Sequence, residues 1–223
     1  MIAPVVSPIA TAAAPAGPVA LLLLAAGAST RMGQPKQLLP YHGRTLLRHA
    51  AETAVATGCA PIVLVTGALH DELLGEVNDL PVQTVHNPEW QSGMASSIRT
   101  GLMAVAGASA VLIMLTDQPM VTPELLRQLL ARQQQTQAPI VAAAYGDTLG
   151  VPAVFDKTMI PQLLQLQGQQ GANRLISSLG SAVGRVPFPA GLLDVDTPEE
   201  YAALLALACA SPPRPLSEKE RGD

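Results

Sequence analysis

The chain has 223 residues, of which 48% are hydrophobic but only 3% aromatic, so it can bury a sizeable core that must consist mainly of aliphatic side chains. Its formal net charge of −4 excludes the broad basic surface that binding to nucleic acid or to anionic membranes requires. Cys59 and Cys209 match no metal-binding spacing, which favours reduced thiols in a cytoplasmic protein.

The first 18 residues are rich in Ala and Pro and contain neither Lys nor Arg. A secretory signal would need a basic start, and cleavage near Ala26 would destroy the most informative motif of the chain. We therefore interpret residues 1–18 as a disordered extension. The tail, residues 209–223, is Pro-rich and then charged and is interpreted in the same way, which leaves residues 19–208 as a single domain.

The most informative stretch runs from Val19 to Pro40. The six apolar residues Val19–Leu24 predict a buried strand and are too few to span a membrane. Small residues follow, and then the two cations Arg31 and Lys36. Main-chain N–H groups in such a turn can approach an anion closely, and the cations can neutralise it. These residues favour a phosphate-binding loop, with an ordinary strand and turn as the alternative.

Two common phosphate-binding motifs are not matched by this loop. Ala25, Ala26 and Ser29 stand where the dinucleotide fingerprint needs glycines. Lys36 does not follow a glycine, as the lysine of a P-loop would. The loop therefore belongs to neither class.

Strands and helices alternate along most of the chain. Further strands are expected at Pro61–Val65, Val82–Val85, Ala110–Thr116, Ile140–Ala144, Gly150–Phe155 and Val183–Phe188. Helices are expected at Thr45–Thr57, Asp71–Val77, Met94–Ala106, Pro123–Gln135, Lys157–Leu166, Gly171–Leu179 and Pro198–Ala208. The alternation predicts an α/β fold with a mainly parallel sheet and helices on both faces. It breaks beyond Tyr145, which indicates an inserted region over the rim of the sheet.

Ligands of such sheets bind at the carboxyl ends of the strands. This rule places the Gly27 loop, Thr66–Gly67, Asn87 and Asp117 along one rim. In addition, the segment Trp90–Leu102 opens a helix with Gly and Ser, and the N–H groups at its start could hold base, ribose or phosphate. The alternative for that segment is a helix capped by Ser92 or Gly93.

Two acidic segments are candidates for the chemistry of the site. Asp117 ends a very apolar strand, where a carboxylate is costly unless it is paired or binds a metal, and Mg²⁺ prefers such oxygens. The alternative is a carboxylate at the start of the helix at Pro123. Asp194 and Asp196 would share one face of an extended segment. Asp196 or Thr197 could equally cap the last helix.

The run from Leu24 to Lys36, Leu-Ala-Ala-Gly-x-Ser-x-Arg-Met-Gly-x-Pro-Lys, resembles the signature of MobA-like nucleotidyltransferases. Within them the chain is most similar to the molybdenum cofactor cytidylyltransferases, from Val19 to about Leu207. The resemblance implies a three-layer α/β/α Rossmann-like nucleotidyltransferase fold, with a nucleotide half at about 19–120 and an acceptor half at about 121–208. Ala25-Ala26-Gly27 is similar to the cytidine-using branch, whereas Ala-Gly-Gly is typical of the guanylyl branch.

The implied reaction transfers CMP from CTP to the terminal phosphate of Mo-molybdopterin, giving molybdopterin cytosine dinucleotide and pyrophosphate. Its labile product implies hand-over to a molybdenum hydroxylase of the xanthine dehydrogenase type or to its chaperone. One alternative is a related nucleotidyltransferase with a guanylyl product, or with a sugar-phosphate or isoprenoid-precursor acceptor. Another is a nucleotide-binding protein or an oxidoreductase that uses this fold without transfer chemistry.

The resemblance also implies roles for individual residues. Arg31 and Lys36 would be catalytic, and Mg²⁺ would be the cofactor, held by Asp117 and Asp196, with Asp194 as the other candidate for the second ligand. The nucleotide would contact Leu24, Ala25, Ala26, Gly27, Ser29, Gly33, Thr66, Gly93, Met94 and Ser97. The acceptor would contact Gln118, Gly150 and Pro152. The segment Gly168–Arg174 departs from the family's pattern, because Gln169 replaces the usual Asp, so its role stays open.

Overall fold

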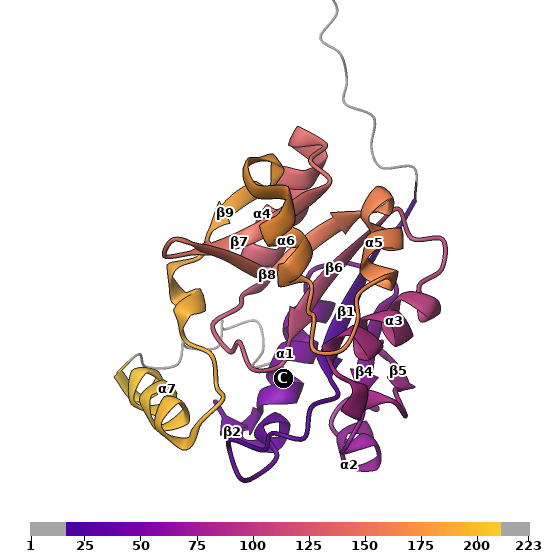
Figure 1. Cartoon of the computed structure of the whole chain (residues 1–223). Helices are drawn as coiled ribbons and strands as arrows, with labels where there is room; N and C mark the ends of the chain where they lie inside the picture. The colour runs from indigo at the N-terminus through magenta and orange to yellow at the C-terminus, as the bar shows by residue number, and fades with distance from the viewer. Residues whose placement is uncertain (1–16, 211–223) are drawn as a thin grey trace, which may run out of the picture.

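A computed structural model describes residues 17–210, so most of the two ends that we expect to be disordered lie outside the described residues. Seven strands form one sheet in the order β5-β4-β1-β6-β8-β7-β9 (Figure 1). Their bounds are Val19–Ala25 (β1), Ile62–Thr66 (β4), Gln83–His86 (β5), Ala110–Leu115 (β6), Ile140–Tyr145 (β7), Thr148–Asp156 (β8) and Gly184–Pro187 (β9). Only β8 runs antiparallel to its neighbours among these strands.

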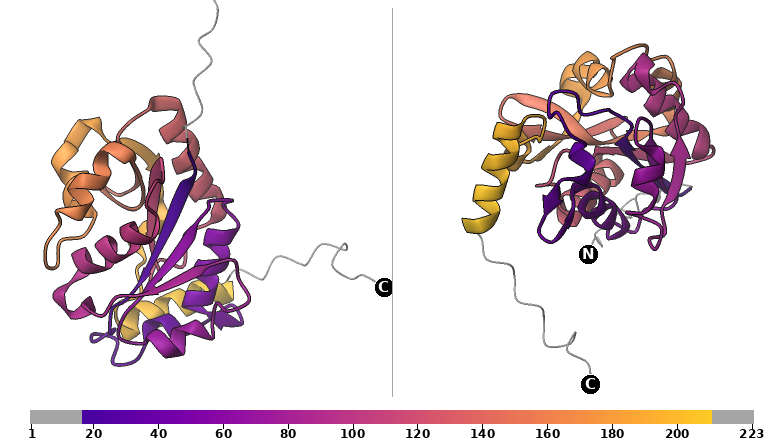
Figure 2. Two further views of the ribbon diagram at one scale, coloured as in Figure 1. Left: turned by 90° about the vertical axis from the view of Figure 1, so that its right-hand side faces the viewer. Right: turned by 90° about the horizontal axis from the view of Figure 1, so that it is seen from below.

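Helices cover both faces of the sheet, as the two views of Figure 2 show. The α-helices are Leu46–Val55 (α1), His70–Leu74 (α2), Met94–Ala104 (α3), Pro123–Thr136 (α4), Ile160–Leu164 (α5), Asn173–Leu179 (α6) and Pro198–Ala210 (α7). Short 3-10 turns are Lys36–Leu38 (η1), Trp90–Ser92 (η2), Lys157–Met159 (η3), Gly180–Ala182 (η4) and Pro189–Leu192 (η5). Helices α3, α5 and α6 pack on one face, and α1, α2 and α4 on the other. The expected α/β/α fold with a mainly parallel sheet is confirmed.

Strand β1 lies at the centre of the sheet and is buried on both faces. Its even-numbered side chains, such as Leu22, pack with Ile98 of α3, and its odd-numbered ones, such as Leu23, pack with Leu47 of α1. This alternation is the pleat of a strand. A strand held from both faces and by two neighbours fixes the position of the loop that follows it.

The structure differs from the expected elements mainly after Tyr145. Strands β7 and β8 form a hairpin, and β8 inserts between β7 and β6, which accounts for the break in the alternation. The helix expected at Lys157–Leu166 is instead η3 followed by the five-residue α5. The Asp156 side chain caps η3 by accepting a hydrogen bond from the N–H of Thr158, so a separate turn forms there.

A small hairpin that the hydrophobic pattern does not reveal follows the first loop. Strands β2 (Pro40–Tyr41) and β3 (Arg44–Thr45) are joined by His42 and Gly43, both with positive φ. Two such residues in succession make the tight turn that suits a two-residue hairpin. Two-residue strands are too short to show a periodicity in the sequence.

Helix α7 packs against this N-terminal region and away from the main sheet. Its Leu204 shares a small apolar cluster with Met32, Leu39 and Tyr41, and the Tyr201 hydroxyl donates a hydrogen bond to the Pro40 carbonyl over 2.7 Å. The end of the chain is thereby attached to the segment that follows β1. Within residues 17–210, no helix combines the length and the apolar character that crossing a membrane requires.

Candidate active site

The carboxyl ends of β1, β4 and β6 meet at one edge of the sheet, because these strands are parallel. A cavity of about 330 Å³ opens there, between the loop after β1 and the start of α3. Its lining includes nine of the expected site residues: Leu24, Ala25, Ala26, Gly27, Lys36, Gly93, Met94, Ser97 and Asp117. That these residues bind a nucleotide stays a prediction.

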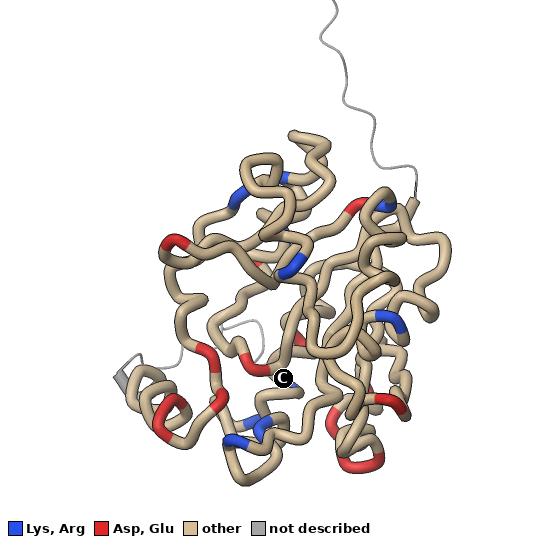
Figure 3. Tube along the Cα trace, in the orientation of Figure 1, with Lys and Arg blue, Asp and Glu red and all other residues tan. Residues whose placement is uncertain are grey.

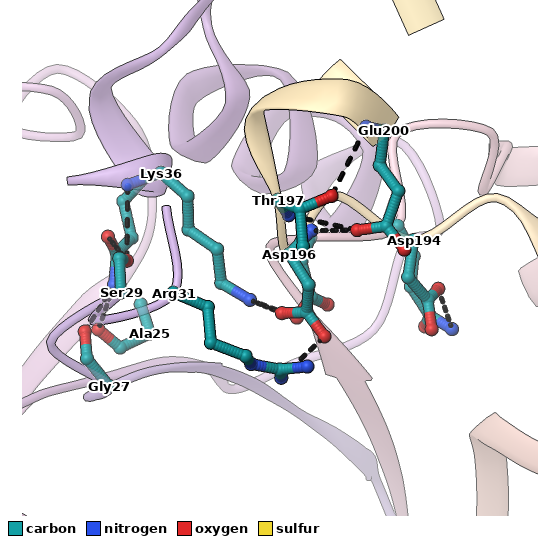
Figure 4. Close-up of polar contacts among 12 residues, drawn as sticks. Ala25, Gly27, Ser29, Arg31, Lys36, Asp194, Asp196, Thr197 and Glu200 are labelled. Carbon is teal, nitrogen blue, oxygen red and sulfur yellow. Dashed lines mark hydrogen bonds and ion pairs between the residues drawn. The ribbon is translucent and has the colours of Figure 1, made fainter. Parts of the chain in front are cut away.

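Four charged side chains converge beside this cavity, and we call them the cation cluster: Arg31, Lys36, Asp117 and Asp196. The Lys36 ammonium lies 2.6 Å from Oδ2 of Asp117. It also lies 2.7 Å from Oδ1 of Asp196 (Figure 4). Arg31 reaches the other oxygen of Asp196 from solvent, also over 2.7 Å. Charged residues are only 13% of the sequence and are sparse along the trace in Figure 3. A cluster of this density is therefore unusual for this chain.

A helix cap places Asp196 in the cluster. Thr197 accepts a hydrogen bond from the N–H of Glu200, and the Glu200 carboxylate accepts from the N–H groups of Asp196 and Thr197. This reciprocal pair is a capping box at the start of α7. Because Thr197 is the cap, the Asp196 side chain is available to Lys36 and Arg31. The adjacent Val195 N–H donates to the Asp117 carbonyl, which ties the two acidic segments together.

Asp117 is likewise not used as a helix cap. Thr122 caps α4, since its side chain accepts a hydrogen bond from the N–H of Leu125, and Pro123 is the first helical residue. The Asp117 carboxylate instead turns toward Lys36. One of its oxygens, Oδ1, is buried and has no hydrogen-bond partner among residues 17–210.

The cluster shifts the ionisation of its members. Burial disfavours the charged form of Lys36, but the neighbouring carboxylates of Asp117 and Asp196 outweigh it, and its pKa is raised. Burial likewise opposes the ionised form of Asp196, but Lys36 and Arg31 outweigh it and lower its pKa. Asp194 forms no ion pair among the described residues, and burial together with the charge of Asp117 raises its pKa to about 6.

A divalent cation fits this donor set. The site contains three carboxylates, those of Asp117, Asp194 and Asp196, but only two cations, Lys36 and Arg31. The Asp117 oxygen that has no hydrogen-bond partner among residues 17–210 is a hard ligand of the kind that Mg²⁺ or Mn²⁺ prefers. No group of three His, Cys, Asp or Glu side chains in residues 17–210 is arranged to hold a metal by itself. A cation at Asp117 and Asp196 would therefore need further oxygens, which triphosphate groups can supply.

The other expected nucleotide residues do not line the cavity. Thr66 is fully buried, and its hydroxyl pairs with His70 and the Val85 carbonyl. Ser29 supports the loop from behind by hydrogen bonds within it. Gly33 has a φ of +71° and open space around it, so it serves the turn of the chain.

Ser97 lines the cavity because Asn87 holds it in place. The buried Asn87 amide donates hydrogen bonds to the hydroxyls of Ser96 (2.8 Å) and Ser97 (3.1 Å), and its N–H donates to the Thr66 carbonyl. Asn87 thereby connects the end of β4 to the start of α3. Only its place on the rim was expected from the sequence.

The three expected acceptor residues lie together on the other side of Asp117. The buried Gln118 side chain donates to the Val151 carbonyl, between Gly150 and Pro152, and to Oδ1 of Asp194. Its own amide oxygen has no partner among the described residues. Gly150 packs against the Tyr145 hydroxyl so closely that a Cβ there would collide with it.

Further lining residues were not among the expected site residues: Ala28, Thr30, Gln37, Trp90, Gln91, Leu115, Thr116 and Gln169. Gln169 comes from the loop between α5 and α6, which reaches the start of α3. The Gly168 carbonyl accepts a hydrogen bond from the N–H of Ala95, and a Cβ on Gly93, whose φ is +112°, would collide with Gly168. Only tertiary structure could show that this loop completes the cavity.

Comparison with known proteins agrees with this architecture. A family model described as the MobA-like NTP transferase domain matches residues 21–183. The nicotine blue oxidoreductase of Paenarthrobacter nicotinovorans is 37% identical over 160 residues, which cover 68% of this chain and 78% of that protein. The purine catabolism protein PucB of Bacillus subtilis is 30% identical over 81% of this chain and 92% of its own. The molybdenum cofactor cytidylyltransferase of Escherichia coli is 25% identical with the same coverage.

Solved structures give the same result. Rv0371c of Mycobacterium tuberculosis superposes with a TM-score of 0.75 at 31% identity, over 86% of this chain and 99% of that one. A structure of Rv0371C described as a complex with manganese superposes with a TM-score of 0.70 at 29% identity, over 85% of this chain and 98% of that one. A divalent cation thus accompanies one related protein of the same fold.

Proposed function

Because the chain belongs to the MobA-like NTP transferase family, we propose that it transfers CMP from CTP to the terminal phosphate of Mo-molybdopterin. The observation that carries this proposal is the convergence of Lys36, Asp117 and Asp196 beside the cavity at the carboxyl end of β1. The similarity to the cytidylyltransferase of Escherichia coli supports the choice of nucleotide and acceptor. So does the Ala25-Ala26-Gly27 form of the loop.

In the proposed reaction, an oxygen of the acceptor phosphate forms a bond to the α-phosphorus of CTP. The bond between that phosphorus and the oxygen bridging to the β-phosphate breaks, and pyrophosphate leaves with the electron pair. The acceptor oxygen is already ionised, so no general base is needed. Arg31 and Lys36 neutralise the charge of the leaving group, and catalysis is then positioning together with electrostatic stabilisation.

Asp117 and Asp196 would hold a magnesium ion in this site. When bound, such an ion supplies Lewis-acid stabilisation of phosphate oxygens. The raised pKa keeps Lys36 cationic, so it can neutralise negative charge that develops on the nucleotide. Gln118, Gly150 and Pro152 would position the acceptor on the far side of Asp117.

The similarity to PucB, a purine catabolism protein, is consistent with a client among purine-oxidising molybdenum enzymes. We therefore propose that the product passes to a molybdenum hydroxylase of the xanthine dehydrogenase type or to its chaperone. Other acceptors on the same fold, sugar phosphates or isoprenoid precursors, would use the same cation cluster. They would differ in the region of Gly150 to Arg174.

A second candidate function rests on the relative that is named nicotine blue oxidoreductase and is 37% identical over most of its length. An oxidoreductase on this fold would bind its ligand in the same cavity without releasing pyrophosphate. It would also not depend on the pairing of Lys36 with Asp117. The two candidates are therefore separated by one assay.

The test is Mg²⁺-dependent pyrophosphate release with a molybdopterin acceptor, comparing CTP with GTP, ATP and UTP. Release is expected with CTP, and Asp117→Ala should lower it about 100-fold or more, since charge stabilisation at the phosphates is lost. Lys36→Ala should lower it by a similar factor. Release with GTP would keep the mechanism and overturn the choice of nucleotide. Binding of nucleotide without any release would favour the second candidate.

A further inference from the structure

Gln37 lies directly behind the loop that follows β1, and its side chain is 1% exposed. Its amide nitrogen donates to the carbonyls of Gly27 (2.7 Å) and Ala25 (3.2 Å), and its amide oxygen accepts from the Ser29 hydroxyl (3.0 Å). Ser29 in turn accepts from the N–H of Lys36, as the close-up in Figure 4 shows for this side of the loop. A buried amide with both its donors and its acceptor engaged has little freedom to move.

The planar geometry of the peptide bond determines where the N–H groups of the loop point once its carbonyls are held. Among the described residues, only Ala60–Pro61 and Val151–Pro152 are cis, so the peptides that begin at Ala25 and Gly27 are trans. In a planar trans peptide the C=O and the following N–H point in opposite directions. With both carbonyls held on Gln37, the N–H groups of Ala26 and Ala28 face away from it.

Those two residues line the cavity. The intervening Ala26 carbonyl is held by the N–H of Ala68 over 3.3 Å, so all three carbonyls of this turn are occupied. In the part of the chain that the structure describes, the N–H groups of Ala26, Gly27 and Ala28 donate to no protein acceptor. Successive main-chain N–H groups that face a cavity in this way can bind an anion.

We propose that Gln37 is a positioning residue that holds the loop in the form that presents these N–H groups to the phosphates of the nucleotide. The inference rests on the proposed nucleotidyl transfer. Without the Gln37 amide, two buried carbonyls would lose their donors, and rotation of either peptide would turn an oxygen toward the phosphates. Gln37 also follows Lys36 in η1, so one short turn sets the cation and the N–H groups together.

The single tryptophan of the chain, Trp90, lines the same cavity, so its fluorescence is the signal chosen to follow binding. The experiment titrates CTP with Mg²⁺, and separately cytidine, into wild type and Gln37→Met, a change of similar size without hydrogen-bonding groups. CTP binding should weaken about 10-fold or more in Gln37→Met, because charge-assisted contacts are lost. Cytidine binding should change less than about 2-fold, because cytidine has no phosphates.

Gln133 on α4 provides the matched control, since it is also a buried glutamine but lies outside the cavity lining. Gln133→Met should leave the affinities for both ligands unchanged. Gln37→Asn keeps an amide that is one methylene too short to reach both carbonyls, and it should show the same selective loss. This second variant decides the matter if Gln37→Met does not fold.

Equal weakening of CTP and cytidine would overturn the inference, since it would indicate general damage to the cavity. Unchanged CTP affinity in both Gln37 variants would also overturn it. If wild type binds CTP and releases pyrophosphate while the Gln37 variants behave like wild type, only this inference fails. If wild type binds none of the four nucleoside triphosphates, the proposed function fails and the inference fails with it.

Discussion

Asp194 and Asp196 are two positions apart, yet they have different partners. Asp196 pairs with Lys36 and Arg31, whereas Asp194 accepts a hydrogen bond from Gln118. Sequence alternation placed both on one face and could not distinguish them. The lowered pKa of Asp196 keeps its carboxylate ionised, as a metal ligand must be, whereas the pKa of Asp194 is raised. Asp196 as the second metal ligand stays a prediction.

Asp196→Asn should lower pyrophosphate release about 100-fold, because it removes a charged ligand and a partner of Lys36. Asp194→Asn is the matched control, since an Asn can still accept the hydrogen bond from Gln118. It should lower release less than about 10-fold. The measurement is the initial rate at saturating Mg²⁺ and CTP, and the reverse order of effects would assign the metal to Asp194.

Lys36 neutralises the carboxylates of Asp117 and Asp196, which would otherwise repel each other. Mg²⁺ should therefore affect the thermal stability of a variant that lacks this lysine. In Lys36→Met, Asp117 and Asp196 should lose their shared counter-ion, and the melting temperature should fall. Millimolar Mg²⁺ should raise the melting temperature of this variant more than that of wild type. An equal response of both proteins, measured by differential scanning calorimetry, would place the metal elsewhere.

The caps of α4 and α7 are alike in kind but differ in their distance from the cation cluster. Thr122→Ala and Thr197→Ala should each lower the free energy of unfolding by about 1 kcal/mol. Only Thr197→Ala should also lower pyrophosphate release, because Thr197 adjoins Asp196. Urea unfolding and initial rates on both variants check this, and an equal loss of activity in Thr122→Ala would contradict it.

Elements with a long apolar signal were well predicted from the sequence, and β1 and α4 are examples. Strand β8 was expected near its true position, but its antiparallel direction was not, because hydrophobic content says nothing about direction. The expected helix after it was too long, since the Asp156 side chain caps a separate 3-10 turn and α5 already ends at Leu164. Local polar contacts decided these boundaries.

The site was predictable to the extent that its residues follow strands directly. Asp117 and Gly27 do so, and both line the cavity. Gln37, Trp90 and Gln169 reach it from a turn, a short helix and a distant loop, where no periodicity marks them. Their contribution depends on which surfaces meet after folding, and one sequence contains no such signal.

His49 joins α1 to the segment after β6 and should make the stability of the whole fold depend on pH. Its Nε2 pairs with the Pro119 carbonyl, and burial, helped by Arg44 and His42, lowers its pKa; the Tyr41 ring packs edge-on against it. The unfolded chain therefore binds a proton more readily than the folded one. Stability from His49 is present above pH 6.5 and is lost as the pH falls from there toward the folded pKa.

The free energy of unfolding of wild type should thus decline between pH 7.5 and pH 5.5 by more than that of His49→Gln. Glutamine can donate the same hydrogen bond without titrating. The slopes of unfolding free energy against pH should differ between the two proteins by at most about 1.4 kcal/mol per pH unit, the limit for one proton. Urea titrations at four pH values measure it, and parallel curves for the two proteins would contradict the assignment to His49.

The cation cluster joins residues from the first, middle and last parts of the chain, 160 positions apart between Lys36 and Asp196. A ribosome synthesises these parts in order, so the nascent chain contains the loop and Asp117 long before Asp196 emerges. The growing polypeptide can fold its central strands early but lacks the residue that closes the cluster. The cluster is therefore completed last, when α7 docks on the segment that was made first.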